Sequence, residues 1–73
     1  MANNITHLGM IGLGRMGGNL VRRIADAGLH AVAYDSTAGI ASALAAENSA
    51  NISAASSIDD LIAQLPLPRA IWV

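Results

Sequence analysis

Four glycines stand close together near the start of the chain, directly after an apolar run. The stretch MIGLGRMGGN places Gly12, Gly14, Gly17 and Gly18 within seven positions. A glycine inside a helix or strand costs about 0.5–1 kcal/mol relative to alanine, so a cluster of four needs a physical reason. Gly12, Gly14 and Gly17 have the spacing G-x-G-x-x-G. Where this pattern joins a strand to a helix, it indicates a loop that binds a pyrophosphate through its main chain.

Each of these three glycines has its own predicted role in such a loop. Gly12 permits a tight turn off the strand, Gly14 leaves room for a pyrophosphate to approach the backbone, and Gly17 lets the helix pack closely on the strand. The N–H groups at the helix start and the positive end of the helix dipole then face the phosphates. The alternatives are an ordinary strand-to-helix turn, or a loop of the same kind that binds FAD or a nucleotide sugar.

An acid closes the next apolar stretch, HAVAYD. Asp35 stands eighteen positions after Gly17, where a carboxylate can accept hydrogen bonds from the hydroxyls of an adenosine ribose and repel a 2′-phosphate. Ser36 and Thr37 follow it, and neither can pair with that phosphate as an arginine would. The sequence therefore predicts NAD rather than NADP. The alternative role for Asp35 is to cap a helix.

The other residues of the loop are weaker candidates for contact with the cofactor. Arg15 stands at the tip of the loop and can reach a phosphate, against the alternative of a solvated helix start. Leu13 and Met16 can touch the cofactor, but Met16 also begins an apolar stripe with Leu20, Ile24 and Ala27, a spacing that favours the core. The residues predicted to bind the cofactor are Gly12, Leu13, Gly14, Arg15, Met16, Gly17, Asp35 and Ser36.

The remaining charged and aromatic residues are assigned to structure. Arg22 is expected on a solvated helix face, with Asp26 as its partner four positions on. His7 and His30 flank strands and have no second histidine or acid at a spacing suited to a metal site or a catalytic base. Trp72 is expected in the core.

The elements that must position the loop alternate between strands and helices. Gly28 suits the left-handed end of the first helix, Ser36 or Thr37 can cap the second, and Ser57 can cap the third. Strands are expected over residues 6–11, 30–35, 69–73 and, less regularly, 50–55; helices are expected from 15 to about 27, from about 38 to 47, and from 58 to 65. This β-α-β-α-β-α-β order predicts an α/β fold with a parallel sheet and right-handed crossovers.

Length and composition narrow the functional classes. The chain has 73 residues, enough for one small domain, with a net charge of −1 and no lysine. It therefore has no basic patch for nucleic acid or an anionic membrane, and without cysteine it has no disulfide or thiolate metal site. Neither a signal peptide nor an apolar span is present, so the expected location is the cytoplasm. The chain stops within the predicted strand RAIWV, which suggests a truncated piece of a longer protein.

Two stretches resemble a known family. GMIGLGRMGGNLVRRIADAGLHAVAYD resembles the start of the decarboxylating 6-phosphogluconate dehydrogenases, particularly their shorter, NAD-preferring branch, and ASSIDDLIAQLPLPRAIWV resembles a later stretch of that branch. The G-L-G-x-M-G core is shared more widely with β-hydroxyacid dehydrogenases. The family's cofactor loop falls on residues 12–17 and its ribose-binding position on Asp35. NADP-using relatives carry Asn-Arg-Ser/Thr at that position, and DSTA lacks it.

The resemblance implies a partial, truncated Rossmann-type doubly wound parallel sheet. Residues 1–73 would form the N-terminal part of a dinucleotide-binding domain, without the rest of that domain and without the substrate domain. The family oxidises 6-phosphogluconate with NAD and releases CO2 to form ribulose 5-phosphate. Its catalytic lysine and glutamate lie beyond residue 73, so this chain alone would be inactive and holds no catalytic residue. The whole protein would take a sugar-phosphate substrate and form a homo-oligomer.

Two further hypotheses remain open at this point. One is another enzyme of the same superfamily, such as a 3-hydroxyisobutyrate-type dehydrogenase or an imine reductase. The other is a stand-alone nucleotide-binding module without catalysis.

Overall fold

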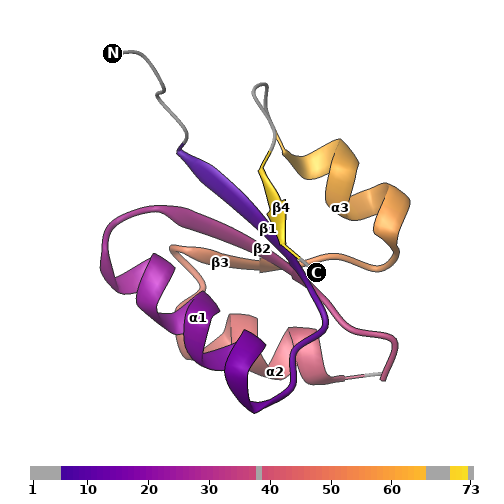
Figure 1. The fold of residues 1–73 in the computed structure, drawn as a ribbon, viewed down its shortest axis with the longest axis horizontal. Helices are drawn as coiled ribbons and strands as arrows, with labels where there is room; N and C mark the ends of the chain where they lie inside the picture. The colour runs from indigo at the N-terminus through magenta and orange to yellow at the C-terminus, as the bar shows by residue number, and fades with distance from the viewer. Residues whose placement is uncertain (1–5, 38, 66–69, 73) are drawn as a thin grey trace.

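The computed structural model describes residues 6–37, 39–65 and 70–72, and within them strands and helices alternate as predicted (Figure 1). In chain order the elements are β1 (His7–Ile11), α1 (Arg15–Asp26), β2 (His30–Tyr34), α2 (Ile40–Glu47), β3 (Ile52–Ala54), α3 (Ile58–Gln64) and β4 (Ile71–Trp72). None of the helices in this described part is long and apolar enough to cross a membrane. The outer residues of the last predicted strand, Arg69 and Val73, lie outside the described residues.

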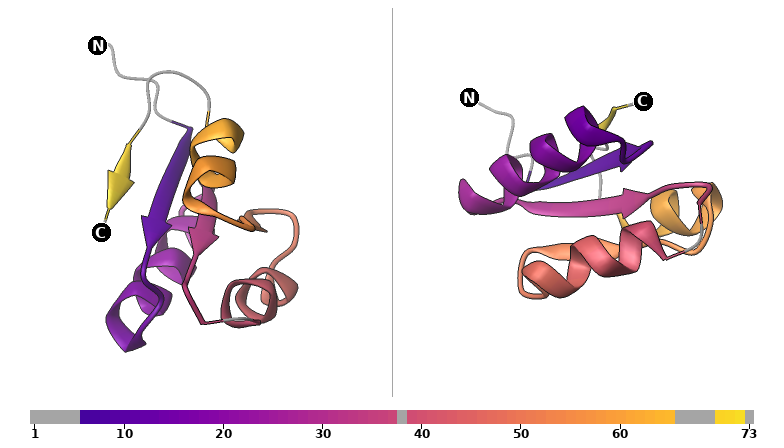
Figure 2. Two further views of the ribbon diagram at one scale, coloured as in Figure 1. Left: turned by 90° about the vertical axis from the view of Figure 1, so that its right-hand side faces the viewer. Right: turned by 90° about the horizontal axis from the view of Figure 1, so that it is seen from below.

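The four strands form one parallel sheet in the order β3-β2-β1-β4. The chain proceeds from β1 outward through β2 to β3, and then crosses to the far side of β1 to form β4. Because parallel crossovers are right-handed, this reversal places the connecting helices on opposite faces. Figures 1 and 2 show α1 and α2 on one face and α3 on the other. The arrangement is that of a truncated Rossmann-type, doubly wound fold.

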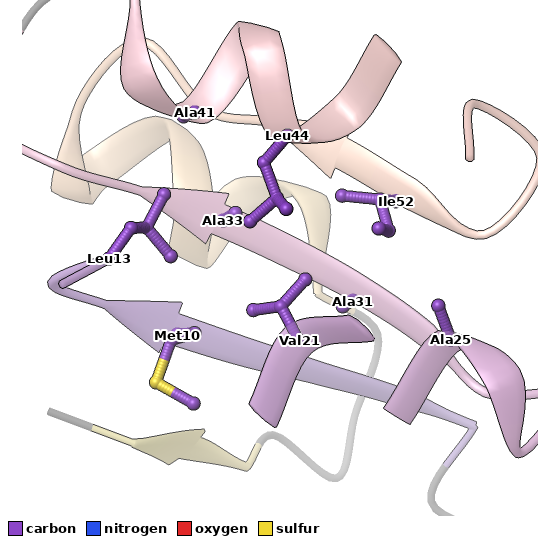
Figure 3. Close-up of a cluster of buried hydrophobic side chains, with 9 residues drawn as sticks. All are labelled: Met10, Leu13, Val21, Ala25, Ala31, Ala33, Ala41, Leu44 and Ile52. Atoms are coloured by element: carbon purple, nitrogen blue, oxygen red, sulfur yellow. The ribbon is translucent and has the colours of Figure 1, made fainter. Parts of the chain in front are cut away.

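Side chains of β2 alternate between the two faces and divide the core in two. Ala31 and Ala33 face α1 and α2, whereas Val32 faces α3. The first cluster, drawn in Figure 3, consists of Met10, Leu13, Val21, Ala25, Ala31, Ala33, Ala41, Leu44 and Ile52. The second contains Val32, Ala55, Leu61 and Leu65. Burial of these side chains on both faces holds the sheet between its helices.

Gly9 lets α3 approach the sheet closely. A Cβ built at Gly9 would lie 2.9 Å from side-chain carbons of both Leu61 and Leu65, so those two leucines occupy the space that a side chain would take. This glycine belongs to packing and not to the loop that follows β1.

The end of α1 is as predicted, and it returns the chain to the sheet. Gly28 has a φ of 91°, which favours glycine. Its N–H donates to the Ala25 carbonyl at 3.0 Å, and the Leu29 N–H donates to the Ile24 carbonyl at 3.2 Å. This pair of bonds is a Schellman motif, which satisfies carbonyls that the helix leaves unpaired.

The buried face of α1 differs from the prediction. Gly18, Val21 and Ala25 are buried, whereas Leu20 and Ile24 of the expected stripe are only half-buried and Ala27 is exposed. The Met16 side chain is 77% exposed, so its assignment to the core is wrong. The physical reason is that α1 turns the side with Gly18, Val21 and Ala25 toward the core, and each residue of a helix changes the direction of its side chain by about 100°, so Met16 points away from that side.

Two other expectations about the helices and the last strand are corrected. The α2 N-cap is Gly39, with a φ of 87° and no side-chain cap, so neither Ser36 nor Thr37 caps this helix. By contrast, Ser57 caps α3 as predicted, because its hydroxyl accepts a hydrogen bond from the Asp60 N–H at 2.9 Å. Trp72 is 52% exposed and not in the core, because β4 pairs with β1 alone in the described part of the sheet.

Candidate functional site

The glycine loop, residues 12–14, lies at the switch point of the sheet, where the direction in which successive strands are added reverses. It joins the carboxyl end of β1 to α1, with β2 paired on one side of β1 and β4 on the other. The strand order reverses beside β1, because α1, which follows β1, lies on one face of the sheet, whereas α3, which leads into β4, lies on the other (Figure 1). In open parallel sheets, ligands bind at such a point.

Gly12 and Gly17 are required by the chain's own geometry. Gly12 has a φ of 93°, and its N–H donates to the Tyr34 carbonyl at 2.9 Å, so it makes the tight turn expected of it. A Cβ at Gly17 would lie 2.2 Å from the Gly12 carbonyl oxygen. Gly17 therefore permits close packing, as predicted, although the atom it approaches most closely belongs to the backbone of the loop, and the nearest strand atom, Cγ of Met10, would be 3.9 Å from such a Cβ.

Gly14 is different, because nothing in the chain itself requires a glycine there. Its φ is −65° and a Cβ at this position would meet no atom within 4 Å. Among the described residues, no side chain caps the amino end of α1 at Gly14, and the first turn of α1 carries no acid. The loop therefore presents bare main chain and the positive end of a helix to open space, which fits an anionic group that must approach the backbone closely.

Asp35 points at the glycine loop. Its Oδ2 accepts a hydrogen bond from the Leu13 N–H at 2.6 Å, and its Oδ1 accepts one from the Thr37 N–H at 2.8 Å. These two hydrogen bonds hold the pKa of the Asp35 carboxyl below its usual value, and the bond from Leu13 has the larger effect. The residue is half-buried and follows directly after β2. The structure thus brings the acid and the loop together, and Asp35 does not cap α2.

The other predicted site residues contribute in different ways. The Leu13 side chain is buried in the first core cluster (Figure 3), and its backbone N–H binds Asp35. Arg15 and Met16 are exposed at the start of α1, and Ser36 is exposed directly after Asp35. The sequence does not predict the hydrogen bond between Leu13 and Asp35, because the bond joins residues 22 positions apart.

Two hollows meet at the loop. One, of about 370 Å³, lies between α1 and α2 and includes Asn19 and Arg22 in its wall. The other, of about 550 Å³, is largely apolar and extends past Met16 to Trp72 of β4. Gly14 and Arg15 line both. A ligand crossing the tip of the loop would therefore have space on either side of it.

An ion pair that the sequence did not predict borders the first hollow. Arg22 of α1 donates from Nε to Oε1 of Glu47 in α2 at 2.8 Å, and from Nη2 to Oε2 at 2.9 Å. The expected pairing of Arg22 with Asp26 is wrong, because the guanidinium turns toward the neighbouring helix. Both side chains are about half exposed, at 47% and 49%, so solvent screens this pair strongly.

The two histidines lie at the opposite end of the sheet from the loop. His7 and His30 are partners in the register of β1 and β2, and their ring centroids are 5.0 Å apart. The His30 Nε2 is hydrogen-bonded to the Ser53 hydroxyl at 2.6 Å. Within the described ranges there is no group of three or more His, Cys, Asp or Glu that could hold a metal ion.

Comparison with known proteins agrees with this geometry. Residues 7–73 match the family described as the NAD binding domain of 6-phosphogluconate dehydrogenase. The chain is 44% identical over 66 residues to a 6-phosphogluconate dehydrogenase of Haloferax volcanii named as NAD(+)-dependent and decarboxylating, covering 90% of this chain and 21% of that protein. It is 38% identical over 75 positions to the decarboxylating 6-phosphogluconate dehydrogenase 2 of Saccharomyces cerevisiae, covering 100% of this chain and 15% of that protein.

The chain thus spans about a fifth or less of the length of these relatives. The matched region contains all the described strands and helices, together with the glycine loop and Asp35. The family match covers nearly the whole chain, and it agrees with the parallel sheet and with the position of the glycine loop at the switch point of that sheet. The chain belongs to the family of NAD-binding domains of 6-phosphogluconate dehydrogenase, whose cofactor is NAD(P).

Proposed function

We propose that the glycine loop and Asp35 bind the adenosine diphosphate half of NAD. The observation that carries this proposal is Gly14, where a side chain would meet no atom of the protein within 4 Å. Neither packing nor backbone strain accounts for a glycine there. Access of a ligand to the main chain does account for it, because phosphate oxygens bind backbone N–H groups at the start of a helix.

The hollows beside the loop support a ligand that extends to both sides of its pyrophosphate, as a dinucleotide does. The hollows of about 370 Å³ and about 550 Å³ lie on either side of the loop and share Gly14 and Arg15. A dinucleotide has a nucleoside on each side of its pyrophosphate, so a pyrophosphate over Gly14 would have room for both. Arg15, which is exposed at the start of α1, adds a positive charge beside the phosphates.

Asp35 supports a preference for NAD over NADP. Its carboxylate is held ionised next to the loop by the Leu13 and Thr37 N–H groups, which lower its pKa. An ionised acid favours ribose hydroxyls and repels a 2′-phosphate. The residues that follow, Ser36 and Thr37, supply no positive charge to offset that repulsion.

For the whole protein, we infer an oxidoreductase that decarboxylates 6-phosphogluconate to ribulose 5-phosphate and reduces NAD. This inference rests on the names of the two relatives and on the family match. The nicotinamide of the bound cofactor supplies the redox chemistry. The residues of this chain bind and orient the cofactor, whereas the groups that act on the sugar phosphate come from outside residues 1–73. On this view the 73-residue chain alone is catalytically inactive.

Substitution of Gly14 by valine tests the role of the loop. Gly14→Val should weaken NAD binding in titration calorimetry by at least about tenfold, because the new side chain fills the approach to the backbone. The free energy of unfolding should fall by no more than about 1 kcal/mol, because a Cβ at this position meets no atom within 4 Å and the remaining cost is that of valine in place of glycine at the N-cap of α1. Ala46→Val, which adds bulk on the exposed face of α2, is the control and should leave NAD affinity unchanged. Equal NAD affinity in the Gly14→Val variant and the wild type would refute the assignment.

A further inference from the structure

One carboxylate ties together two loops that are far apart in the sequence. Asp35 reaches from the end of β2 to the glycine loop through Oδ2, at 2.6 Å from the Leu13 nitrogen. Its Oδ1 accepts from the Thr37 N–H in its own loop at 2.8 Å. Both bonds join groups of the protein itself, and the bond to Leu13 links residues 22 positions apart.

The bond to Leu13 acts on a single peptide unit. That unit consists of the Gly12 carbonyl and the Leu13 N–H. Asp35 binds its N–H edge. Gly17 packs against its carbonyl edge so closely that a Cβ at Gly17 would lie 2.2 Å from the oxygen. The peptide plane is therefore held on both edges, and a rotation of that plane would break the bond or drive the oxygen into α1.

The rest of the loop is also anchored on either side of this peptide. The Gly12 N–H donates to the Tyr34 carbonyl at 2.9 Å, and the Leu13 side chain is only 7% exposed in the first core cluster. The orientation of the peptide between these two anchors depends on Asp35. The orientation of this peptide in turn determines the position of the Gly14 backbone at the amino end of α1.

The carboxylate retains capacity for a ligand while it does this. Two carboxylate oxygens offer about four acceptor positions in all. One N–H occupies a position on each oxygen, and the Thr37 side chain is a further hydrogen-bond partner of the carboxylate. A vicinal diol that donates two hydrogen bonds can use the remaining position and displace the Thr37 hydroxyl, and both N–H bonds then stay in place.

We propose that Asp35 is a positioning residue that sets the glycine loop in its binding geometry before the cofactor arrives, and that the same carboxylate then accepts a vicinal diol without releasing the loop. The second half of this statement rests on the proposed function, whereas the first half concerns the protein alone. An ordered loop lowers the cost of binding, because less motion is lost when the ligand arrives.

The test compares ADP with 2′,3′-dideoxy-ADP, which carries the pyrophosphate but no ribose hydroxyl. Both ligands are titrated into the intact protein and its Asp35→Asn and Asp35→Ala variants. Both variants remove the charge, but asparagine keeps a side-chain oxygen for the Leu13 N–H and alanine does not. If Asp35 positions the loop, Asp35→Ala should bind the dideoxy nucleotide about threefold to tenfold more weakly than Asp35→Asn. If Asp35 recognises only the ribose, the two variants will bind the dideoxy nucleotide equally, and that result overturns the proposal.

Hydrogen exchange of the Leu13 amide in the cofactor-free protein gives an independent measure. Exchange should be about threefold to tenfold faster in Asp35→Ala than in Asp35→Asn. The Val21 and Ala25 amides in the middle of α1 should exchange alike in both variants, which shows that the fold is intact. Equal exchange at Leu13 overturns the positioning role. If the wild type binds neither nucleotide, the proposed function fails, and the exchange experiment still decides the role of Asp35 in the free protein.

Discussion

Two adjacent glycines of α1 should respond in opposite ways to the same substitution. A Cβ at Gly17 would lie 2.2 Å from the Gly12 carbonyl oxygen, well inside the 3.0 Å below which something must shift. The obstructing atom belongs to a backbone that Asp35 and Tyr34 hold by hydrogen bonds, so it cannot move cheaply. A Cβ at Gly18 would have its nearest neighbours at 3.8 Å and 3.9 Å, which is ordinary contact.

The magnitudes follow from these distances. Overpacking costs about 1–3 kcal/mol, and replacing a helical glycine by alanine returns up to about 1 kcal/mol. Gly17→Ala should therefore lower the free energy of unfolding by about 1–2 kcal/mol. Gly18→Ala should raise it by about 0.5–1 kcal/mol, because it gains helix propensity without a clash. Such changes are large for a domain whose total stability is about 5–15 kcal/mol.

Urea denaturation followed by circular dichroism measures both variants against the wild type, without cofactor. The order of midpoints should be Gly18→Ala, wild type and Gly17→Ala, from the most to the least stable. The matched pair controls for the general effect of alanine in a helix. If Gly17→Ala is as stable as Gly18→Ala, the helix does not pack on the loop as described, and the reasoning about the loop peptide is wrong.

Two more predictions concern cofactor choice and pH. Asp35→Asn combined with Ser36→Arg should shift the ratio of NAD to NADP dissociation constants toward NADP by at least about tenfold, because it removes the repelling charge and adds a partner for the 2′-phosphate; an unchanged ratio in calorimetry would contradict the role of Asp35 at the ribose. Burial and then the nearby His7 hold the pKa of His30 below its ordinary value of 6.5, so the unfolded chain binds this proton more readily than the folded protein. The free energy of unfolding should therefore fall as the pH falls from 6.5 through the lowered folded pKa. His30→Gln should flatten that part of the profile in urea titrations at successive pH values, and identical slopes in the two proteins would rule this out.

The sequence by itself determined the order of the strands and helices, the position of the glycine turn after the first strand, and the acid, Asp35, that follows the second strand. These features have local causes. Gly12 and Gly28 adopt positive φ values of 93° and 91°, which favour glycine, and Ser57 caps the helix that follows it in the chain. The helical and strand periods likewise depend on near neighbours, so the β-α alternation could be predicted. The spacing from Gly17 to Asp35 was informative because one helix and one strand of ordinary length fill it.

Only the tertiary structure decided which atoms meet. Leu13 and Asp35 are 22 positions apart, Arg22 and Glu47 are 25 apart, and His7 meets His30 through the register of two strands. The exposure of Met16 depends on how far α1 is rotated on the sheet, and that of Trp72 depends on which strands flank β4. Strand register and helix rotation are set by packing summed over the whole core, to which each residue contributes only a part. A local pattern can therefore predict that a glycine loop and an acid belong together, but not that the acid binds the loop's own backbone.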